Sequence, residues 1–206
     1  MLTIWGRTNS INVQKVLWAC AEMKVPYDRI DAGMQYGVNN TPEFRRMNPN
    51  GLVPLLRDGK LILWESHAIV RYLARGHGMG TLLPADPQAA ADADRWMDWV
   101  ATTVWPPTRT VFWGLVRTPP EKRNMTDIDA AVIKLGEILA MLDAHLADRP
   151  WVTGDAFSMG DIPIGCIVQR WFNVETKRPP LPRVEAYYQR LQARPAFKQI
   201  VDGPLT

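Results

Sequence analysis

Residues 48–72 read NPNGLVPLLRDGKLILWESHAIVRY, and this stretch decides the fold of the N-terminal part of the chain. It divides into a turn, a short apolar strand, a tight turn, a second apolar strand and the beginning of a helix. Asp58-Gly59 is a dipeptide typical of two-residue hairpin turns, and it has apolar residues on both sides. Apolar residues recur with helical spacing after Glu65-Ser66, so a helix is expected to begin there.

The chemistry of this stretch is that of a peptide-binding unit. Pro54 has no N–H group, and a proline at the entry of a strand indicates a special geometry such as a cis peptide bond. The N–H and C=O of Val53 are then available to an extended ligand, as the groups of a sheet edge are. Ser66 at a helix N-terminus offers a hydroxyl and unpaired N–H groups to a carboxylate. A plain hairpin followed by a serine-capped helix is the alternative interpretation.

The combination NPxGxVP, hairpin, ESxAI and apolar helix resembles the glutathione-binding half of the glutathione S-transferases. That resemblance implies that Val53 binds the cysteinyl backbone of glutathione and that Pro54 holds the Val53 backbone open. It also implies that Glu65 meets the ammonium and Ser66 the carboxylate of the γ-glutamyl end.

The sequence departs from the phi-type pattern at two places. Asn39 and Asn40 stand where a basic residue often precedes the next helix, and Leu52 stands where a glutamine often precedes the Val-Pro pair. The residue that binds the glycine carboxylate of glutathione is therefore not identified by the family pattern. Gln35, Asn40 and Arg7 are the alternatives.

The rest of the N-terminal part fits a thioredoxin-like domain. Strands are expected at residues 2–5 and 26–31, on either side of a helix that begins at residues 10–12, and Thr41-Pro42-Glu43 is a helix start. The resulting order is βαβ–α–ββ–α. Residues 76–80 and 84–87 indicate a linker, and strand signals are absent after it. We therefore predict a thioredoxin-like glutathione-binding domain over residues 1–78 and an all-helical domain over residues 88–206, an α/β plus all-α fold.

Helical patterns fill the second domain. A long pattern covers residues 88–116, and Pro106-Pro107 should bend or break it. The sequences Thr126-x-x-Asp129 and Ser158-x-x-Asp161 resemble capping boxes, and we interpret the second pair as folding residues.

Ser10 is the candidate for catalysis, with Asn12 as a neighbour that could share the role. It follows the first strand at the start of the first helix, where serine-type transferases of the phi and theta kind place their active hydroxyl. Lowering a thiol pKa from about 8.5 to about 7 needs roughly 2 kcal/mol of preference for the thiolate. A hydrogen bond to a charged group contributes ~1.5–3 kcal/mol, and a helix N-terminus adds roughly 0.3–1 kcal/mol. The alternative is that Ser10 is only a helix cap.

The resemblance implies an electrophile pocket on the long helical segment. The expected lining residues are Trp105, Arg109, Trp113 and Trp171, with Trp99, Thr103, Phe112 and Arg170 as further candidates. Each of them taken singly fits a core position as well. Arg109 is the exception, because its charge needs water or an anion.

Composition excludes several classes of function. The chain has 206 residues and a net charge of +3 with scattered basic residues, and no apolar run is long enough to span a membrane. We expect neither nucleic acid nor membrane as a partner. Cys20 and Cys166 form no CxxC or metal spacing, and no signal peptide is visible, which favours the cytoplasm. The histidines are dispersed along the chain, so no metal site is expected.

The leading hypothesis is a glutathione S-transferase that activates the glutathione thiol for attack on a small hydrophobic electrophile. Glutathione is then a co-substrate, and the resemblance implies a homodimer. One alternative is a glutathione-dependent disulfide or peroxide reductase, although no cysteine stands near Ser10. Another is a non-catalytic protein that binds glutathione or another ligand on the same fold.

Overall fold

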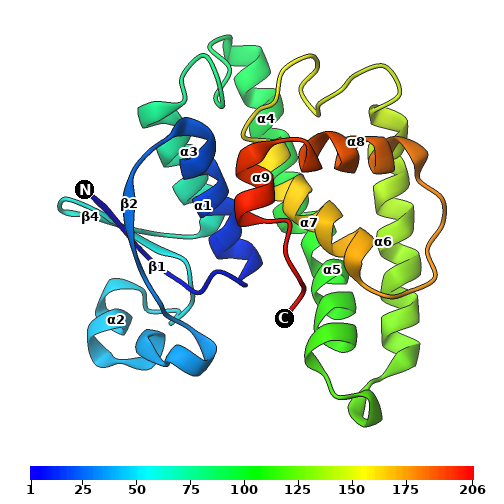
Figure 1. Cartoon of the computed structure of the whole chain (residues 1–206), viewed down its shortest axis with the longest axis horizontal. Helices are drawn as coiled ribbons and strands as arrows, with labels where there is room; N and C mark the ends of the chain where they lie inside the picture. Colours follow the sequence, from blue (N-terminus) through cyan, green and yellow to red (C-terminus); the bar gives the residue numbers. More distant parts are fainter. The chain divides into compact units, whose positions relative to one another are not determined.

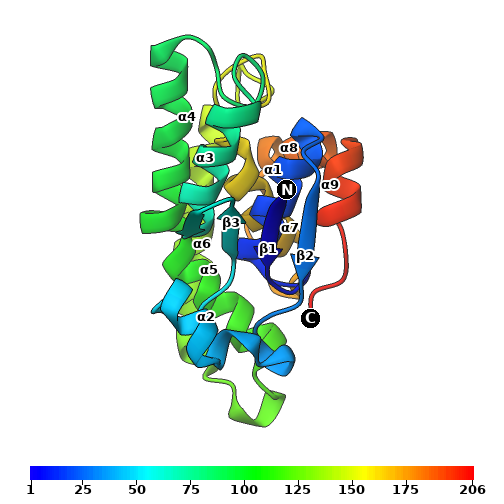
Figure 2. The same cartoon turned by 90° about the vertical axis from the view of Figure 1, so that its left-hand side faces the viewer.

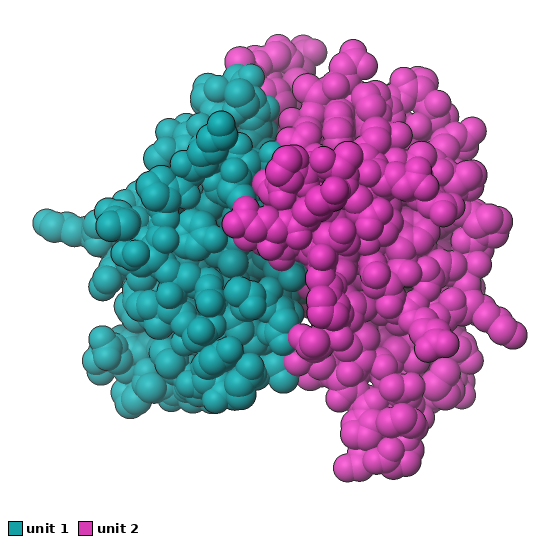
Figure 3. Space-filling view, viewed as in Figure 1, with its two compact units in different colours: residues 1–83 teal, residues 84–206 magenta.

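The computed structural model describes all 206 residues. They form two compact units, Met1–Leu83 and Pro84–Thr206, which are coloured separately in Figure 3. Each unit has its own secondary structure and is described by itself.

The N-terminal unit is built on a four-stranded mixed sheet with the order β2-β1-β3-β4. β1 pairs with β2 in parallel, whereas the β1–β3 and β3–β4 pairs are antiparallel. α1 and α3 pack against each other beside the sheet, and α2 lies apart from them (Figures 1 and 2). The predicted thioredoxin-like order is therefore confirmed. The bounds are β1 Leu2–Trp5, α1 Ile11–Met23, β2 Tyr27–Ile30, 3-10 helices Met34–Tyr36 and Val38–Asn40, α2 Pro42–Met47, β3 Leu55–Asp58, β4 Leu61–Trp64 and α3 Ser66–His77.

Local signals in the sequence explain most of these boundaries. Thr41 caps α2 by accepting a hydrogen bond from the Phe44 N–H at 3.2 Å, and Pro42 occupies the first helical position. The Val53-Pro54 peptide bond is cis, as the sequence suggests.

The hairpin turn lies one residue later than the dipeptide Asp58-Gly59 predicts. Asp58 pairs with Leu61, so the two loop residues are Gly59 and Lys60. Gly59 has a φ of 56°, which a glycine adopts without strain. Asp58 stays in the strand, and its carboxylate accepts a hydrogen bond from the Tyr72 hydroxyl at 2.7 Å.

The C-terminal unit is all-helical, as predicted, and α6 is the longest of its helices (Figure 1). Apolar residues that recur with helical spacing on α6 are buried, including Leu135, Leu139 and Leu142. The bounds are α4 Pro87–Trp99, a π-helical segment Val100–Val104, α5 Trp105–Phe112, a second π-helical segment Trp113–Arg117, a 3-10 helix Pro120–Lys122, α6 Met125–His145, α7 Asp161–Asn173, α8 Pro182–Gln192 and α9 Pro195–Ile200.

Pro106-Pro107 does not break the long helical segment. The chain changes to π-helical geometry over Val100–Val104, just before the prolines, and returns to an α-helix at Trp105. There the Trp105 N–H donates to the Val100 carbonyl, five residues back. Pro106 and Pro107 lack N–H donors, and the π-helical turn before them shifts the hydrogen-bond register by one residue. The helical segment therefore continues through the prolines where a break was expected.

The predicted N-cap of α6, Thr126, is wrong by two residues. Asn124 caps α6, and Thr126 lies inside the first turn. The Asn124 side chain accepts from the Asp127 N–H at 3.4 Å and donates to the Asp127 carboxylate at 2.7 Å. Asparagine is as good a cap as threonine, and this second contact favours the earlier start.

The predicted capping pair before α7 is present and buried. The Ser158 N–H donates to the Asp161 carboxylate at 2.8 Å, and the same carboxylate accepts from the Val152 N–H and the Tyr187 hydroxyl. Burial raises the pKa of Asp161 to about 6, so it is ionised at neutral pH and accepts all these bonds. These contacts give Ser158 and Asp161 a structural role.

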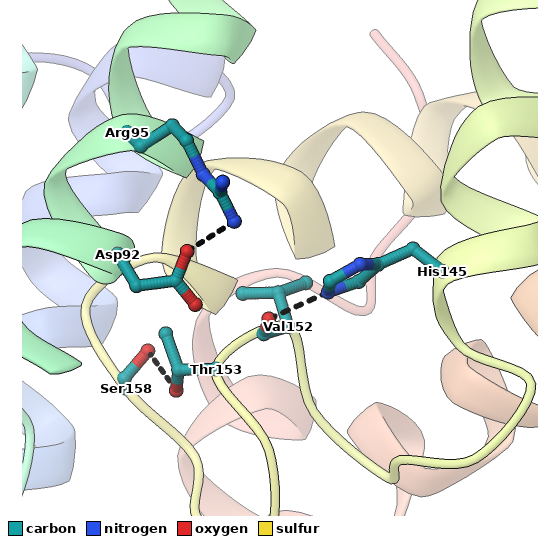
Figure 4. Close-up of polar contacts among 6 residues, drawn as sticks. All are labelled: Asp92, Arg95, His145, Val152, Thr153 and Ser158. Carbon is teal, nitrogen blue, oxygen red and sulfur yellow. Dashed lines mark hydrogen bonds and ion pairs between the residues drawn. The ribbon is translucent and has the colours of Figure 1, made fainter.

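Figure 4 shows the loop that precedes this capping pair. The Thr153 hydroxyl donates to the Ser158 hydroxyl at 3.1 Å. The His145 ring, at the end of α6, donates from Nε2 to the Val152 carbonyl at 2.8 Å. On α4, Asp92 and Arg95 form an ion pair. The ring of His145 therefore anchors the loop.

Candidate functional site

Ser10 stands at the N-cap position of α1, directly after the loop that leaves β1. Its backbone is extended, with a φ of −86°, and its side chain makes no capping hydrogen bond with the helix. The residue is buried, with 7% of its surface exposed. The hydroxyl therefore lies beside the unpaired N–H groups of a helix N-terminus and is not used as a cap.

Val53 and Pro54 lie just before β3, against the core of the N-terminal unit. Val53 packs on a cluster formed by Trp5, Ala32, Phe44 and Leu55. Neither its N–H nor its C=O makes a backbone hydrogen bond. Both groups can therefore pair with an extended peptide, as the groups of a sheet edge do.

Glu65, not Ser66, occupies the cap position of α3. Glu65 has a φ of 72° and makes no side-chain capping bond, and Ser66 is the first helical residue. A positive φ is uncommon for a residue other than glycine, and such strain is concentrated at functional positions. The interpretation of Ser66 as a simple helix cap is wrong, since it lies inside the helix. Ser66 is buried, with 5% of its surface exposed, at a helix end whose N–H groups point outward.

A polar network that the sequence analysis missed connects α1 with the start of α3. The Ser66 hydroxyl donates to Asn12 Oδ1 over a long 3.5 Å, and Lys15 Nζ donates to the same oxygen at 3.0 Å. Lys15 Nζ also lies 3.1 Å from His67 Nε2. An ammonium group only donates, so His67 Nε2 is the acceptor and the ring proton is on Nδ1. Asn12 thus orients Ser66 and has no direct contact with Ser10 in this network.

One signal in the sequence could have revealed this network. Lys15 lies three residues after Asn12 on the same face of the helix, in a stripe that also contains the apolar residues Trp18 and Ala19. It is almost fully buried, with 3% of its surface exposed. A lysine is rarely buried without polar partners, so its position in that stripe predicts partners from another element.

The structure places the three candidates for binding the glycine end of glutathione in two different surroundings. Gln35 and Asn40 lie in the two 3-10 helices that follow β2, and both are exposed. Arg7 is next to Val53: a Cβ atom on Gly33 would lie 2.8 Å from Arg7 Nη1 and 3.3 Å from Val53 Cγ2. The structure therefore brings Arg7 and Val53 together around Gly33, which has a φ of 91°.

Three of the four expected pocket residues lie together on the C-terminal unit. Trp105, Arg109 and Trp113 line a cavity of about 470 Å³ together with Pro106 and Thr110. They are four residues apart, so they share one face of the helical segment.

The structure separates Trp171 from this cavity. Trp171 is buried, with 3% of its surface exposed, and lines a cavity of only about 10 Å³ with residues such as Phe112 and Leu135. Its Nε1 is buried and makes no hydrogen bond.

The two cysteines do not contribute a reactive thiol. Both are buried, and burial raises the pKa of the Cys20 thiol to about 12. Cys20 is therefore a small apolar residue of the core. No group of three or more histidine, cysteine, aspartate or glutamate side chains is arranged to hold a metal ion. None of the helices combines the length and hydrophobicity of a membrane-spanning segment.

Comparisons with known proteins agree over the whole chain. The N-terminal domain model of the glutathione S-transferases matches residues 1–75, and their C-terminal domain model matches residues 126–190. The chain is 46% identical to glutathione S-transferase GstB of Escherichia coli (strain K12), over the full length of both proteins. It is 32% identical to glutathione S-transferase 4 of Zea mays, over 96% of this chain and 90% of that protein.

A solved structure supports the same relationship. The theta class glutathione S-transferase from the citrus canker pathogen Xanthomonas axonopodis pv. citri, with glutathione bound, matches with a TM-score of 0.96. It is 48% identical to this chain, and the match covers 100% of this chain and 99% of that one.

Proposed function

Since the chain belongs to the glutathione S-transferase family, we propose that it is an enzyme that activates the glutathione thiol for attack on small hydrophobic electrophiles. The observation that carries this proposal is the Ser10 hydroxyl, which is buried at the N-terminus of α1 and makes no capping bond. Such a hydroxyl can donate its hydrogen bond to a thiolate. The relative from Xanthomonas was solved with glutathione bound, which supports glutathione as the co-substrate here.

The catalytic effect follows from stabilisation of the charged sulfur. A serine hydroxyl is too weak an acid to act as a base near neutrality, so the thiol proton leaves to solvent when the thiolate forms. The hydroxyl and the positive end of the helix then favour the thiolate together. Binding also holds the sulfur close to the electrophile, which lowers the entropic cost of reaction.

The backbone of Val53 and the N-terminus of α3 are the proposed binding groups for glutathione. The N–H and C=O of Val53 have no backbone partners, so they fit the cysteinyl residue of an extended tripeptide. Pro54, the residue after Val53, has no N–H of its own and holds the Val53 backbone open. The Ser66 hydroxyl and the helix N–H groups fit the γ-glutamyl carboxylate, and Glu65 fits its ammonium.

The glycine end of glutathione needs a donor for its carboxylate. Gln35 and Asn40 are proposed because they are exposed on the segment between β2 and α2. Arg7 is the alternative that charge favours, because guanidinium binds carboxylate with two parallel hydrogen bonds. Its position beside Val53 supports this alternative.

We assign the two tasks of the enzyme to two domains. Residues 1–78 form the proposed glutathione-binding domain, and residues 88–206 carry the electrophile pocket. Trp105, Arg109 and Trp113 are the proposed pocket residues because they line one cavity of about 470 Å³. Trp171 is less well supported, since it is buried elsewhere in the unit.

A homodimer in the cytoplasm is the proposed state of the protein. The basis is the family relationship together with the two buried cysteines, which form no disulfide and so suit a reducing compartment. Light scattering on the purified full chain tests the dimer: a mass near twice the 23.3 kDa of the chain supports it, and a mass near 23.3 kDa contradicts it.

An ultraviolet difference titration of bound glutathione tests the proposed activity. Thiolate absorbance is followed against pH with the purified protein, and a thiol pKa well below about 8.5 supports an activated thiol. Binding without a depressed pKa would favour a non-catalytic binding protein. Absence of binding would contradict the proposed site.

A further inference from the structure

We propose that the cavity lined by Trp105, Arg109 and Trp113 selects flat aromatic electrophiles that carry a carboxylate or a similar anionic group. The inference rests on the proposed function and names the substrate class of that site. It depends on the volume of the cavity, on the two tryptophans that line it and on the one charged residue among its lining residues.

The cavity has the size and the walls that a single-ring aromatic compound needs. Its volume of about 470 Å³ lies within the ~300–1,000 Å³ typical of small-molecule sites. Trp105 and Trp113 are eight residues apart and line the same cavity, and Trp113 is 48% exposed. A flat, electron-poor ring can stack on the half-exposed indole face of Trp113, which is electron-rich.

Arg109 lies between the two tryptophans in sequence and supplies the charge of the cavity. It is exposed, its side chain forms no ion pair or hydrogen bond with the rest of the chain, and no acidic residue lines the cavity. Other arginines of this unit are engaged by the protein: Arg183 pairs with Asp143, and Arg123 donates to the backbone. The guanidinium of Arg109 is therefore available to a ligand, and its planar set of donors matches a carboxylate.

The reaction expected for this class is nucleophilic aromatic substitution. The glutathione thiolate forms a C–S bond with a ring carbon that carries chlorine, the C–Cl bond breaks, and chloride leaves. The proton of the thiol has already passed to solvent, so charge and atoms balance. Arg109 orients the ring through the anionic group and takes no part in the bond changes.

Two chlorinated compounds of similar shape, one anionic and one neutral, provide the test. The substrates are 4-chloro-3,5-dinitrobenzoate and 4-chloro-3,5-dinitrobenzamide, assayed with the wild type and with Arg109→Gln and Arg109→Lys. We expect Arg109→Gln to lower kcat/KM about fivefold for the benzoate, the range of an exposed ion pair. The kcat/KM of Arg109→Gln for the benzamide should change less than twofold. Arg109→Lys should keep part of the activity on the benzoate that Arg109→Gln loses.

Lys198→Gln is the matched control, because it removes one exposed positive charge from α9 in the same unit. It should leave the activity on both substrates unchanged. An equal loss on both substrates in Arg109→Gln, or no loss on either, overturns the inference.

A binding measurement separates failure of this inference from failure of the proposed function. Isothermal titration with unreactive 3,5-dinitrobenzoate and 3,5-dinitrobenzamide needs no catalysis. Tighter binding of the benzoate, lost in Arg109→Gln, supports the selectivity even if conjugation is absent. Equal affinities for the two compounds contradict the selectivity even if conjugation occurs.

Discussion

Replacing Ser10 with alanine tests the proposed catalytic centre most directly. The hydroxyl is buried and makes no capping bond, so its removal deletes only the proposed contact with the glutathione sulfur. A hydrogen bond to a charged group contributes ~1.5–3 kcal/mol, and one pKa unit corresponds to about 1.4 kcal/mol. The pKa of the bound thiol should therefore rise by roughly 1–2 units. Turnover at pH 6.5 should fall about ten- to a hundredfold, because it follows the fraction of thiolate.

The pH profile decides whether the loss has this origin. The difference between Ser10→Ala and the wild type should shrink as the pH rises above the thiol pKa of the variant, where both thiols are ionised. A loss that is equal at every pH would refute the reasoning, and so would an unchanged thiol pKa. Thr41→Ala is the matched control, because Thr41 does cap its helix. It should lower the free energy of unfolding by about 1 kcal/mol and leave the thiol pKa unchanged.

Three further experiments test the glutathione contact of Ser66, the capping role of Asp161 and the burial of Cys20. Ser66→Ala should weaken glutathione binding at least about tenfold in calorimetry, because the γ-glutamyl carboxylate loses a charge-assisted hydrogen bond; an unaltered Kd would count against that contact. Asp161→Asn should lower the free energy of unfolding by about 3 kcal/mol or more in a urea titration, because several buried donors lose their carboxylate, and a loss below about 1 kcal/mol would contradict the capping role. Cys20 should resist iodoacetamide at pH 8 in the folded protein, because its thiol is buried with a pKa of about 12; mass spectrometry should detect its alkylation only after unfolding, and rapid labelling of the folded chain would refute its burial.

Short-range features of the chain were predictable because neighbouring residues determine them. Thr41-Pro42 contains a cap and a first-position proline, and the helix begins there. Ser10 was placed at the start of α1 by the strand and loop before it. The errors of detail arose where two local choices compete, such as Asn124 against Thr126 as a cap.

Contacts between distant parts of the sequence were beyond such reasoning. The Asn12–Ser66 contact joins residues 54 positions apart, and Lys15 and His67 are separated by 52. The position of Lys15 predicts polar partners on another element, but nothing in either segment alone identifies α3 as the element that packs beside α1. The same holds for Trp171. The sequence analysis expects it in the electrophile pocket, but packing within the helical unit buries it away from that cavity.

The sequence by itself determined the order of strands and helices, the position of the cis Val53-Pro54 bond and the placement of Ser10 and Ser66 at helix starts. These depend on backbone chemistry that acts within a few residues: missing N–H groups, turn dipeptides and helix ends. The roles of Ser10, Glu65 and Ser66 toward glutathione came from the resemblance to the glutathione S-transferases and stay predictions. Tertiary structure alone decided that the Ser10 hydroxyl makes no capping bond, that Asn12 contacts Ser66, and that Glu65 adopts a positive φ. The reason is that side-chain partners and strained backbone are imposed by packing, which brings together groups that are far apart in the chain.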